Sequence, residues 1–211
     1  ELGMDDYIRK GIYAALDAVA TVVPDRGVHA VGYCIGGTIL SIAAAALADW
    51  GDTRIQDVTL LAAQTDFSEP GELSLFISPA QIEMLEAIMY KEGVLDSKQM
   101  GAAFAMLRAH DLLWQPAVKS YLKGERDQQI DLMAWNADGT RMPWKMHTEY
   151  LLGLYLHNDL AEGRFKVEGE EINLADIPVP MFVVGTETDH VAPWKSVYKA
   201  DRLVGSSEFT F

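Results

Sequence analysis

The residue best suited to covalent chemistry is the single cysteine, Cys34, because glycines flank it at a regular spacing. Gly32 and Gly36 lie two residues before and after it. This pattern, between an apolar strand-like run and a helix-like run, holds a nucleophile in a tight, strained turn at the end of a strand. The backbone N–H of Ile35 then faces a developing oxyanion, and the helix behind the sulfur is expected to lower the pKa of the thiol. The pattern predicts a catalytic nucleophile, with an ordinary buried cysteine in a Gly-rich turn as the alternative.

Such a nucleophile needs a base and an orienting acid, which follow it in the order acid, then histidine. Asp189 is the favoured acid, because it lies in a short polar loop between an apolar run and a helix that starts with proline. Asp66, which follows another apolar run, is the weaker candidate. For both residues the alternative is a surface or helix-capping aspartate.

The general base is harder to place. None of the five histidines follows the last predicted strand: His29, His110, His147, His157 and His190. The side chain of His190 is expected to point away from that of its neighbour Asp189. We therefore expect the base to lie beyond residue 211 and the sequence to be a fragment.

Hydrophobic periodicity predicts the elements that would position these residues. The first part of the chain predicts, in order, a helix, a strand, a helix and a strand, over residues 4–23, 28–33, 39–48 and 58–63. This alternation is typical of a parallel α/β sheet. The end of the chain resumes it with a strand, a helix and the start of a strand, over residues 181–185, 193–203 and 209–211.

The alternation stops for about 110 residues after Asp66, where helical segments dominate. Helices are predicted over residues 79–91, with Ser78 as the N-cap, over 97–108, ending before Trp114, and over 144–159; residues 111–143 have no clear period. A small hairpin is predicted from residues 165–167 and 172–174. The simplest organisation is a core at 1–66 that carries the Cys34 turn, a mainly helical lid at 67–176, and a second core segment at 177–211 that carries the acid.

Composition excludes several classes of protein. The 211 residues are 49% hydrophobic and carry a net charge of −14, so a surface that tracks nucleic-acid phosphates is not expected. One cysteine forms no internal disulfide. The longest apolar stretch, residues 39–47, is too short to span a bilayer. We expect a soluble, cytoplasmic protein with no transmembrane segment, metal site or cofactor.

Three motifs together resemble the polyhydroxyalkanoate synthases of class I: GYCIGGT at 32–38, WNADGTRMP at 135–143 and DHVAPW at 189–194. Shorter similarities at 5–7, 64–67 and 176–180 extend the resemblance to nearly the whole chain. It implies an α/β-hydrolase fold with a lid, and a homodimer. It also implies that the enzyme polymerises (R)-3-hydroxyacyl-CoA, short-chain such as 3-hydroxybutyryl-CoA, with release of CoA.

By the same resemblance, Cys34 matches the thiol that carries the acyl group and Asp189 matches the catalytic aspartate. His190 matches a histidine beside that aspartate rather than the general base. The growing polyester chain and the cytoplasmic storage granule are the implied partners, and the CoA thioester is a substrate, so no cofactor is implied. A set of lid residues is expected to line an acyl channel or to form the lid core: Met84, Met89, Trp114, Trp135, Trp144, Tyr150 and Tyr155.

The sequence departs from that family in lacking the Gly-His segment with the base, the amino-terminal domain and the early strands. The sheet should then keep about four strands and leave an unpaired edge beside residues 28–33. Two alternatives remain open. One is a hydrolase of the dienelactone hydrolase kind, which has a similar Gly-Tyr-Cys turn but no long lid. The other is a non-catalytic granule-binding or dimerisation module.

Overall fold

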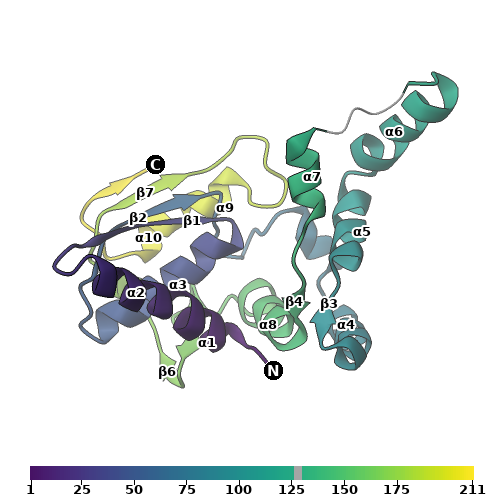
Figure 1. Cartoon of the computed structure of the whole chain (residues 1–211). Coiled ribbons are helices and arrows are strands. Elements are labelled where there is room, and N and C mark those ends of the chain that lie inside the picture. The colour runs from purple at the N-terminus through teal and green to yellow at the C-terminus, as the bar shows by residue number, and fades with distance from the viewer. Residues whose placement is uncertain (126–129) are drawn as a thin grey trace.

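The computed structural model describes residues 1–125 and 130–211, and its centre is a parallel sheet of four strands (Figure 1). The strand order is β1 (Val28–Tyr33), β2 (Ile55–Leu61), β7 (Met181–Val184) and β8 (Phe209–Thr210), and all three pairings are parallel. Strand β1 lies at an edge of this sheet. The α/β class, the strand number and the open edge at β1 are therefore confirmed.

Strand β2 begins and ends earlier than the predicted 58–63. Ile55 is buried and pairs with Val28, so the strand extends toward the N-terminus. At its other end Ala62 has a φ of 48°, which removes it from the extended conformation and ends the strand.

Helix α3 (Ile35–Asp49) packs on one face of this sheet and forms the centre of the core. It begins directly after Cys34, four residues before the predicted start, because Gly36 and Gly37 continue the helix instead of forming a loop. Every residue from Gly37 to Leu47 is buried. Most are alanine or other small residues, so the helix comes close to the strands, against Val58, Leu60 and Val183.

The N-terminal helical run covers the same core from outside α3. It consists of α1 (Met4–Asp6), the π-helical η1 (Tyr7–Tyr13) and α2 (Ala14–Val22), which together match the predicted 4–23. Ile8 and Leu16 are buried in the cluster that contains α3. The predicted amphipathic helix is confirmed.

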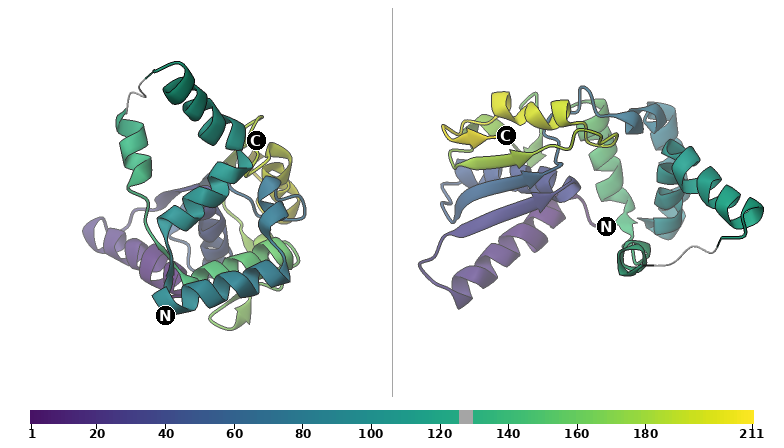
Figure 2. Two further views of the ribbon diagram at one scale, coloured as in Figure 1. Left: turned by 90° about the vertical axis from the view of Figure 1, so that its right-hand side faces the viewer. Right: turned by 90° about the horizontal axis from the view of Figure 1, so that it is seen from above.

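The opposite face of the sheet is largely open. Val31 and Tyr33 on β1 are 66% and 69% exposed, and Phe182 on β7 is 48% exposed. Seen from above, the strands lie in front of α3, with no helix of the described residues over β1 and β2 (Figure 2, right). The described part of the chain thus covers one face of its sheet.

A mainly helical region connects β2 to β7 and extends away from the sheet (Figure 1; Figure 2, right). Its elements are η2 (Glu72–Phe76), α4 (Pro79–Glu92), β3 (Val94–Leu95), α5 (Ser97–Leu107), η3 (His110–Trp114), α6 (Gln115–Ala117), η4 (Val118–Leu122), α7 (Asp131–Ala137), β4 (Met142–Pro143), α8 (Trp144–Glu149) and η5 (Tyr150–Leu156). The Ser78 side chain accepts a hydrogen bond from the Gln81 N–H, and Gly93 ends α4 in the left-handed conformation. The predicted cap and helix are confirmed there.

The helix predicted over 97–108 is confirmed as α5, and two further helical parts of this region were not predicted. Residues 110–122 form one continuous helical run through η3, α6 and η4, with Pro116 inside it. Residues 131–137 of the stretch without a period form α7. Residues 126–129 of that stretch lie outside the described residues.

The segment before β7 returns to the core. Strands β5 (Lys166–Val167) and β6 (Glu170–Glu171) form the predicted hairpin, although its second strand comes earlier because Glu168 and Gly169 turn the chain with positive φ. The 3-10 turn η6 (Leu174–Asp176) follows, and Leu174 is buried in the cluster that contains α3. Helices α9 (Trp194–Tyr198) and α10 (Ala200–Leu203) lie within the predicted 193–203. The division at residues 66 and 176 stays a prediction.

None of the helices in the described ranges is long and apolar enough to cross a membrane.

Candidate active site

Cys34 occupies the turn between β1 and α3 with a strained backbone. Its φ is 52° and its ψ is −129°, outside the regions that residues with a side chain usually adopt. Its N–H donates to the Leu61 carbonyl at 2.9 Å, and its carbonyl accepts from the N–H groups of Gly37 and Thr38 at 2.9 and 3.2 Å. Hydrogen bonds to β2 and α3 therefore hold the strained residue in place.

Two glycines permit this turn by close packing. A Cβ on Gly32 would lie 2.4 Å from the Cα of Gly37, and a Cβ on Gly37 would lie 2.4 Å from the Cβ of Ala63. Gly36, by contrast, faces open space. The residues that the turn requires to be glycine are thus Gly32 and Gly37, whereas the sequence pattern pointed to Gly32 and Gly36.

The pKa of the Cys34 thiol is raised, which corrects the expectation of a lowered one. Burial in an apolar site is the main cause, and the negative charge of Asp189 adds to it. The Ile35 N–H, hydrogen-bonded to the sulfur, opposes this shift. Desolvation of the thiolate outweighs the favourable helix terminus, so this thiol needs a base to become a nucleophile.

The sulfur opens into a cavity of about 310 Å³ with mostly apolar walls. Ile35, Thr38 and Ala62 contribute the wall on the sheet side. The remaining wall comes mainly from the helical region, with Leu73, Phe76, Met100, Phe104, Leu151 and Tyr155 among its residues. A cavity of this kind suits an acyl chain better than a charged group.

Asp189 lies beside this cavity in the loop after β7. Its Oδ1 accepts hydrogen bonds from the N–H groups of Val191 and Ala192 at 2.8 and 2.9 Å, and its Oδ2 accepts one from the Thr186 hydroxyl at 3.1 Å. Val191 and Ala192 themselves line the cavity. Helix α9 has Pro193 as its N-cap, so Asp189 is not the cap of that helix. The loop fixes a half-buried carboxylate close enough to Cys34 to affect its pKa.

The weaker acid candidate, Asp66, has a different role in the structure. Its Oδ1 accepts hydrogen bonds from the Ser68 N–H and hydroxyl and from the Asn158 amide, at 2.7, 2.5 and 3.2 Å. It therefore joins the end of β2 to the segment after η5, and it is not among the residues that line the cavity.

Among the histidines, His147 is the one that lines the cavity. His29, His110 and His157 are exposed or nearly so and pair with Asp57, Asp111 and Asp159. His190 is half-buried outside the cavity lining. The sequence placed His147 in the lid but gave it no role. The signal was available: His147, Tyr150 and Leu151 have the spacing of one helix face.

Of the seven lid residues expected to line an acyl channel or to form the lid core, two line the cavity, and the acyl role of that cavity stays a prediction. Tyr150 and Tyr155 line the cavity, and burial raises the pKa of Tyr155 to about 12. Met84, Trp114 and Trp135 are 63%, 67% and 71% exposed, so they form neither the channel nor the lid core. Met89 is buried outside the cavity, and Trp144 packs against Tyr90.

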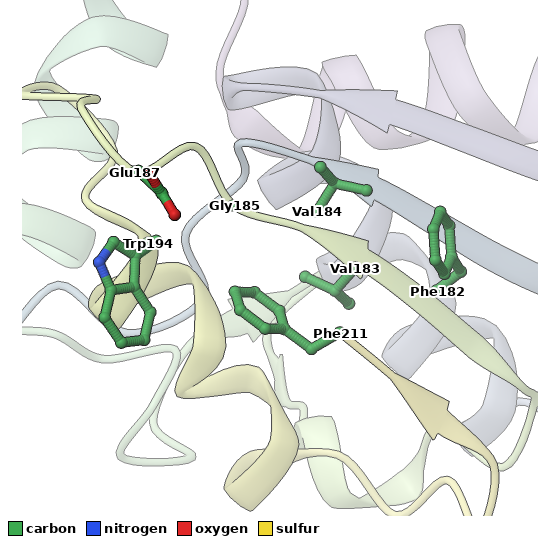
Figure 3. Close-up of a pocket in the computed structure, with 7 residues that line it drawn as sticks. All are labelled: Phe182, Val183, Val184, Gly185, Glu187, Trp194 and Phe211. Carbon is green, nitrogen blue, oxygen red and sulfur yellow. The ribbon is translucent and has the colours of Figure 1, made fainter.

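A second pocket lies beside β8, at the edge of the sheet opposite to β1 (Figure 3). Phe182, Trp194 and Phe211 form its apolar walls, and Glu187 is its one ionisable side chain. It has no nucleophile. Across residues 1–125 and 130–211, no three His, Cys, Asp or Glu side chains are grouped so as to hold a metal ion.

Comparisons with known proteins agree with this geometry. Residues 4–211 match the alpha/beta hydrolase fold family. The chain is 42% identical over 203 residues to a poly(3-hydroxyalkanoate) polymerase subunit PhaC of Rhizobium meliloti (strain 1021), covering 96% of this chain and 32% of the relative. It is 33% identical over 208 residues to the subunit of the same name in Cupriavidus necator, covering 96% of this chain and 35% of that relative.

The chain thus spans about a third of the length of these curated relatives. Among solved structures, a monoacylglycerol lipase of Paleococcus ferrophilus superposes with a TM-score of 0.52 at 13% identity, covering 99% of this chain and 64% of that one. At this identity the similarity concerns the fold alone.

Proposed function

Because the chain belongs to the alpha/beta hydrolase fold family, we propose that it uses the nucleophile turn of that fold for acyl transfer, as the catalytic core of a poly(3-hydroxyalkanoate) polymerase. The observation that carries this proposal is the strained Cys34 in the wall of an apolar cavity. The similarity to poly(3-hydroxyalkanoate) polymerases over nearly the whole chain supports it.

In the first step, the Cys34 sulfur attacks the carbonyl carbon of a (R)-3-hydroxyacyl-CoA. A bond forms between that sulfur and the acyl carbon, and the bond to the CoA sulfur breaks. The thiol proton passes through the base to the departing CoA thiolate, which leaves as free CoA. The Ile35 N–H is directed at the sulfur and would stabilise the oxyanion. One thioester replaces another, so the acyl group stays activated.

In the second step, a hydroxyl oxygen attacks the acyl carbon on Cys34. The new ester bond forms, the bond to the Cys34 sulfur breaks, and the hydroxyl proton passes through the base to that sulfur. We propose that the base is a histidine other than the five of this sequence, and that Asp189 orients it. The two backbone hydrogen bonds go to Oδ1, and Oδ2 accepts one from the Thr186 hydroxyl, so Oδ2 keeps one lone pair for this contact.

Exclusion of water separates a polymerase from an esterase, since water would hydrolyse the acyl thioester. The helical region between β2 and β7 supplies most of the cavity wall. A region of this length also argues against a compact hydrolase of the dienelactone hydrolase kind. We propose that the substrate is short-chain, with 3-hydroxybutyryl-CoA as the first choice, that no cofactor takes part, and that the enzyme acts as a homodimer at cytoplasmic storage granules.

The test is CoA release from 3-hydroxybutyryl-CoA by the full-length gene product, together with isolation of the polyester. Cys34→Ala should reduce CoA release by at least about 1000-fold, because the acyl carrier is removed. Asp66→Asn is the control, with an activity within a few-fold of the unaltered protein. Turnover retained by Cys34→Ala would remove Cys34 from the mechanism. CoA release without polymer would indicate the hydrolase, and no release by the unaltered protein would indicate the non-catalytic module.

A further inference from the structure

The cavity that holds Cys34 also holds a polar side chain to which the two steps above assign no part. His147, on α8, is 9% exposed, and its Nδ1 is buried without a hydrogen-bond partner among the residues that the structure describes. Its helix neighbour Met146 and the cavity residue Leu151 are buried and apolar. Burial lowers the pKa of His147 to about 4, so the ring is neutral near pH 7 and has one donor and one acceptor nitrogen.

A buried polar group without a partner costs free energy, and folded proteins contain few of them. Leucine at this position would fill similar space in an apolar wall without that cost. The unpaired imidazole is therefore better explained as half of an interaction whose other half is a bound molecule.

The helix face that carries His147 also passes close to Cys34. His147, Tyr150 and Leu151 have the spacing of neighbours on one face, and all three line the cavity. Burial, Tyr155 and the nearby charge of Cys34 together raise the pKa of Tyr150. His147 thus lies one helical turn from Tyr150, whose pKa is affected by the charge of Cys34.

We propose that the His147 imidazole hydrogen-bonds to an oxygen substituent of the acyl chain in the cavity, so that the cavity prefers hydroxyacyl groups to plain fatty acyl groups. This rests on the proposed function, because it concerns the acyl group that Cys34 receives. A hydroxyl on the acyl chain pairs with the neutral ring. A plain alkyl chain also contacts the apolar walls, but it leaves the His147 imidazole without a hydrogen-bond partner.

The experiment compares two substrates in single-turnover CoA release by the full-length gene product, 3-hydroxybutyryl-CoA and butyryl-CoA. The unaltered protein should prefer the hydroxylated substrate. His147→Leu should reduce that preference by about 10 to 100-fold, while the rate with butyryl-CoA changes by less than about threefold. His147→Gln, which keeps a donor and an acceptor, should retain most of the preference. A preference unchanged in His147→Leu, or equal losses on both substrates, would overturn the proposal.

A binding measurement separates this proposal from the proposed reaction. Calorimetry on the Cys34→Ala protein, with and without His147→Leu, gives the ratio of Kd values for the same two CoA thioesters without turnover. If the unaltered protein releases no CoA, the polymerase proposal fails, and this ratio still decides the role of His147. The melting temperature of His147→Leu should equal or exceed that of the unaltered protein. If the His147→Leu protein does not fold, the His147→Phe protein is used in its place.

Discussion

Helices α3 and α5 both line the cavity but are built in opposite ways. In α3, all residues from Gly37 to Leu47 are buried, and close contacts with the sheet fix the turn that holds Cys34. In α5, no residue is buried, although Met100 and Phe104 face the same cavity. The wall that would perform the chemistry is rigid and closely packed, whereas the wall that would contact the acyl chain is loosely held.

The difference continues beyond α5. Several large apolar side chains along η3, η4 and α7 are more than half exposed: Leu112, Trp114, Tyr121, Leu122, Leu132, Met133 and Trp135. Few buried contacts hold these elements to the rest of the chain, so they should open at a lower free energy than α3. We expect catalytic geometry and selectivity for acyl-chain length to reside in parts of different stability, and the following predictions test that division.

The largest effect is expected at Asp189, on the rigid side. Asp189→Asn keeps an oxygen for the N–H groups of Val191 and Ala192, so the loop should keep its shape. Loss of the charge should slow polymer elongation by about 100-fold or more, since a hydroxyl of high pKa needs more help from the base than a thiol does. Rapid-quench measurement should show a first burst of CoA followed by slow release. Equal slowing of the burst and the later phase would contradict this division of labour.

A matched pair of glycines tests packing in the two helices. Gly37→Ala should lower the free energy of unfolding by about 1 to 3 kcal/mol, because the new methyl group meets the Ala63 side chain at 2.4 Å. Gly101→Ala in α5 faces open space and should raise it by about 0.5 to 1 kcal/mol, through the gain in helix propensity. Urea titration measures both changes. Similar losses in the two variants would show that α5 is packed as closely as α3.

The Cys34 thiol, at the start of α3, should titrate at a higher pH than an ordinary cysteine. Because burial raises its pKa, Cys34 is mostly protonated at neutral pH, and its alkylation by iodoacetamide should accelerate with pH until it passes a midpoint above the usual value of about 8.5. The same cysteine in the urea-unfolded chain should have its midpoint near the usual value. The midpoint, unlike the absolute rate, does not depend on access of the reagent. A folded-state midpoint below that of the unfolded chain would mean that the helix N-terminus outweighs burial.

The smallest effect on folding is expected on the loose side. Phe104→Ala should enlarge the cavity from α5, at a cost of less than about 1 kcal/mol, because Phe104 is only half-buried. CoA release should shift toward longer acyl chains, by about 10-fold in the ratio of 3-hydroxyhexanoyl-CoA to 3-hydroxybutyryl-CoA. Leu75→Ala, at a side chain that is 75% exposed, is the control. An unchanged ratio would mean that α5 does not limit the acyl chain.

Most of the fold was predictable because it depends on local patterns. The apolar runs at 28–33 and 181–185, the Ser78 cap and the glycines around Cys34 each encode a strand, a helix start or a turn within a few residues. They were sufficient for the α/β class and its strands, whereas the open edge at β1 was predicted from the early strands that the resembled family has and this sequence lacks. The resemblance of three motifs added the family, which the match to residues 4–211 and the curated relatives support.

Other properties depended on groups that are distant in the sequence. Whether Gly36 or Gly37 makes the close contact depends on Ala63, in the loop after the next strand. The direction of the Cys34 pKa shift depends on how completely the lid and the sheet remove water, and local spacing suggested the opposite. Likewise, helical spacing puts His147 on one face with Tyr150 and Leu151, but packing decides that this face lines the cavity while Trp114 and Trp135 face solvent. Local propensities and turn chemistry are carried by the sequence itself, but desolvation and close contact are properties of the assembled tertiary structure.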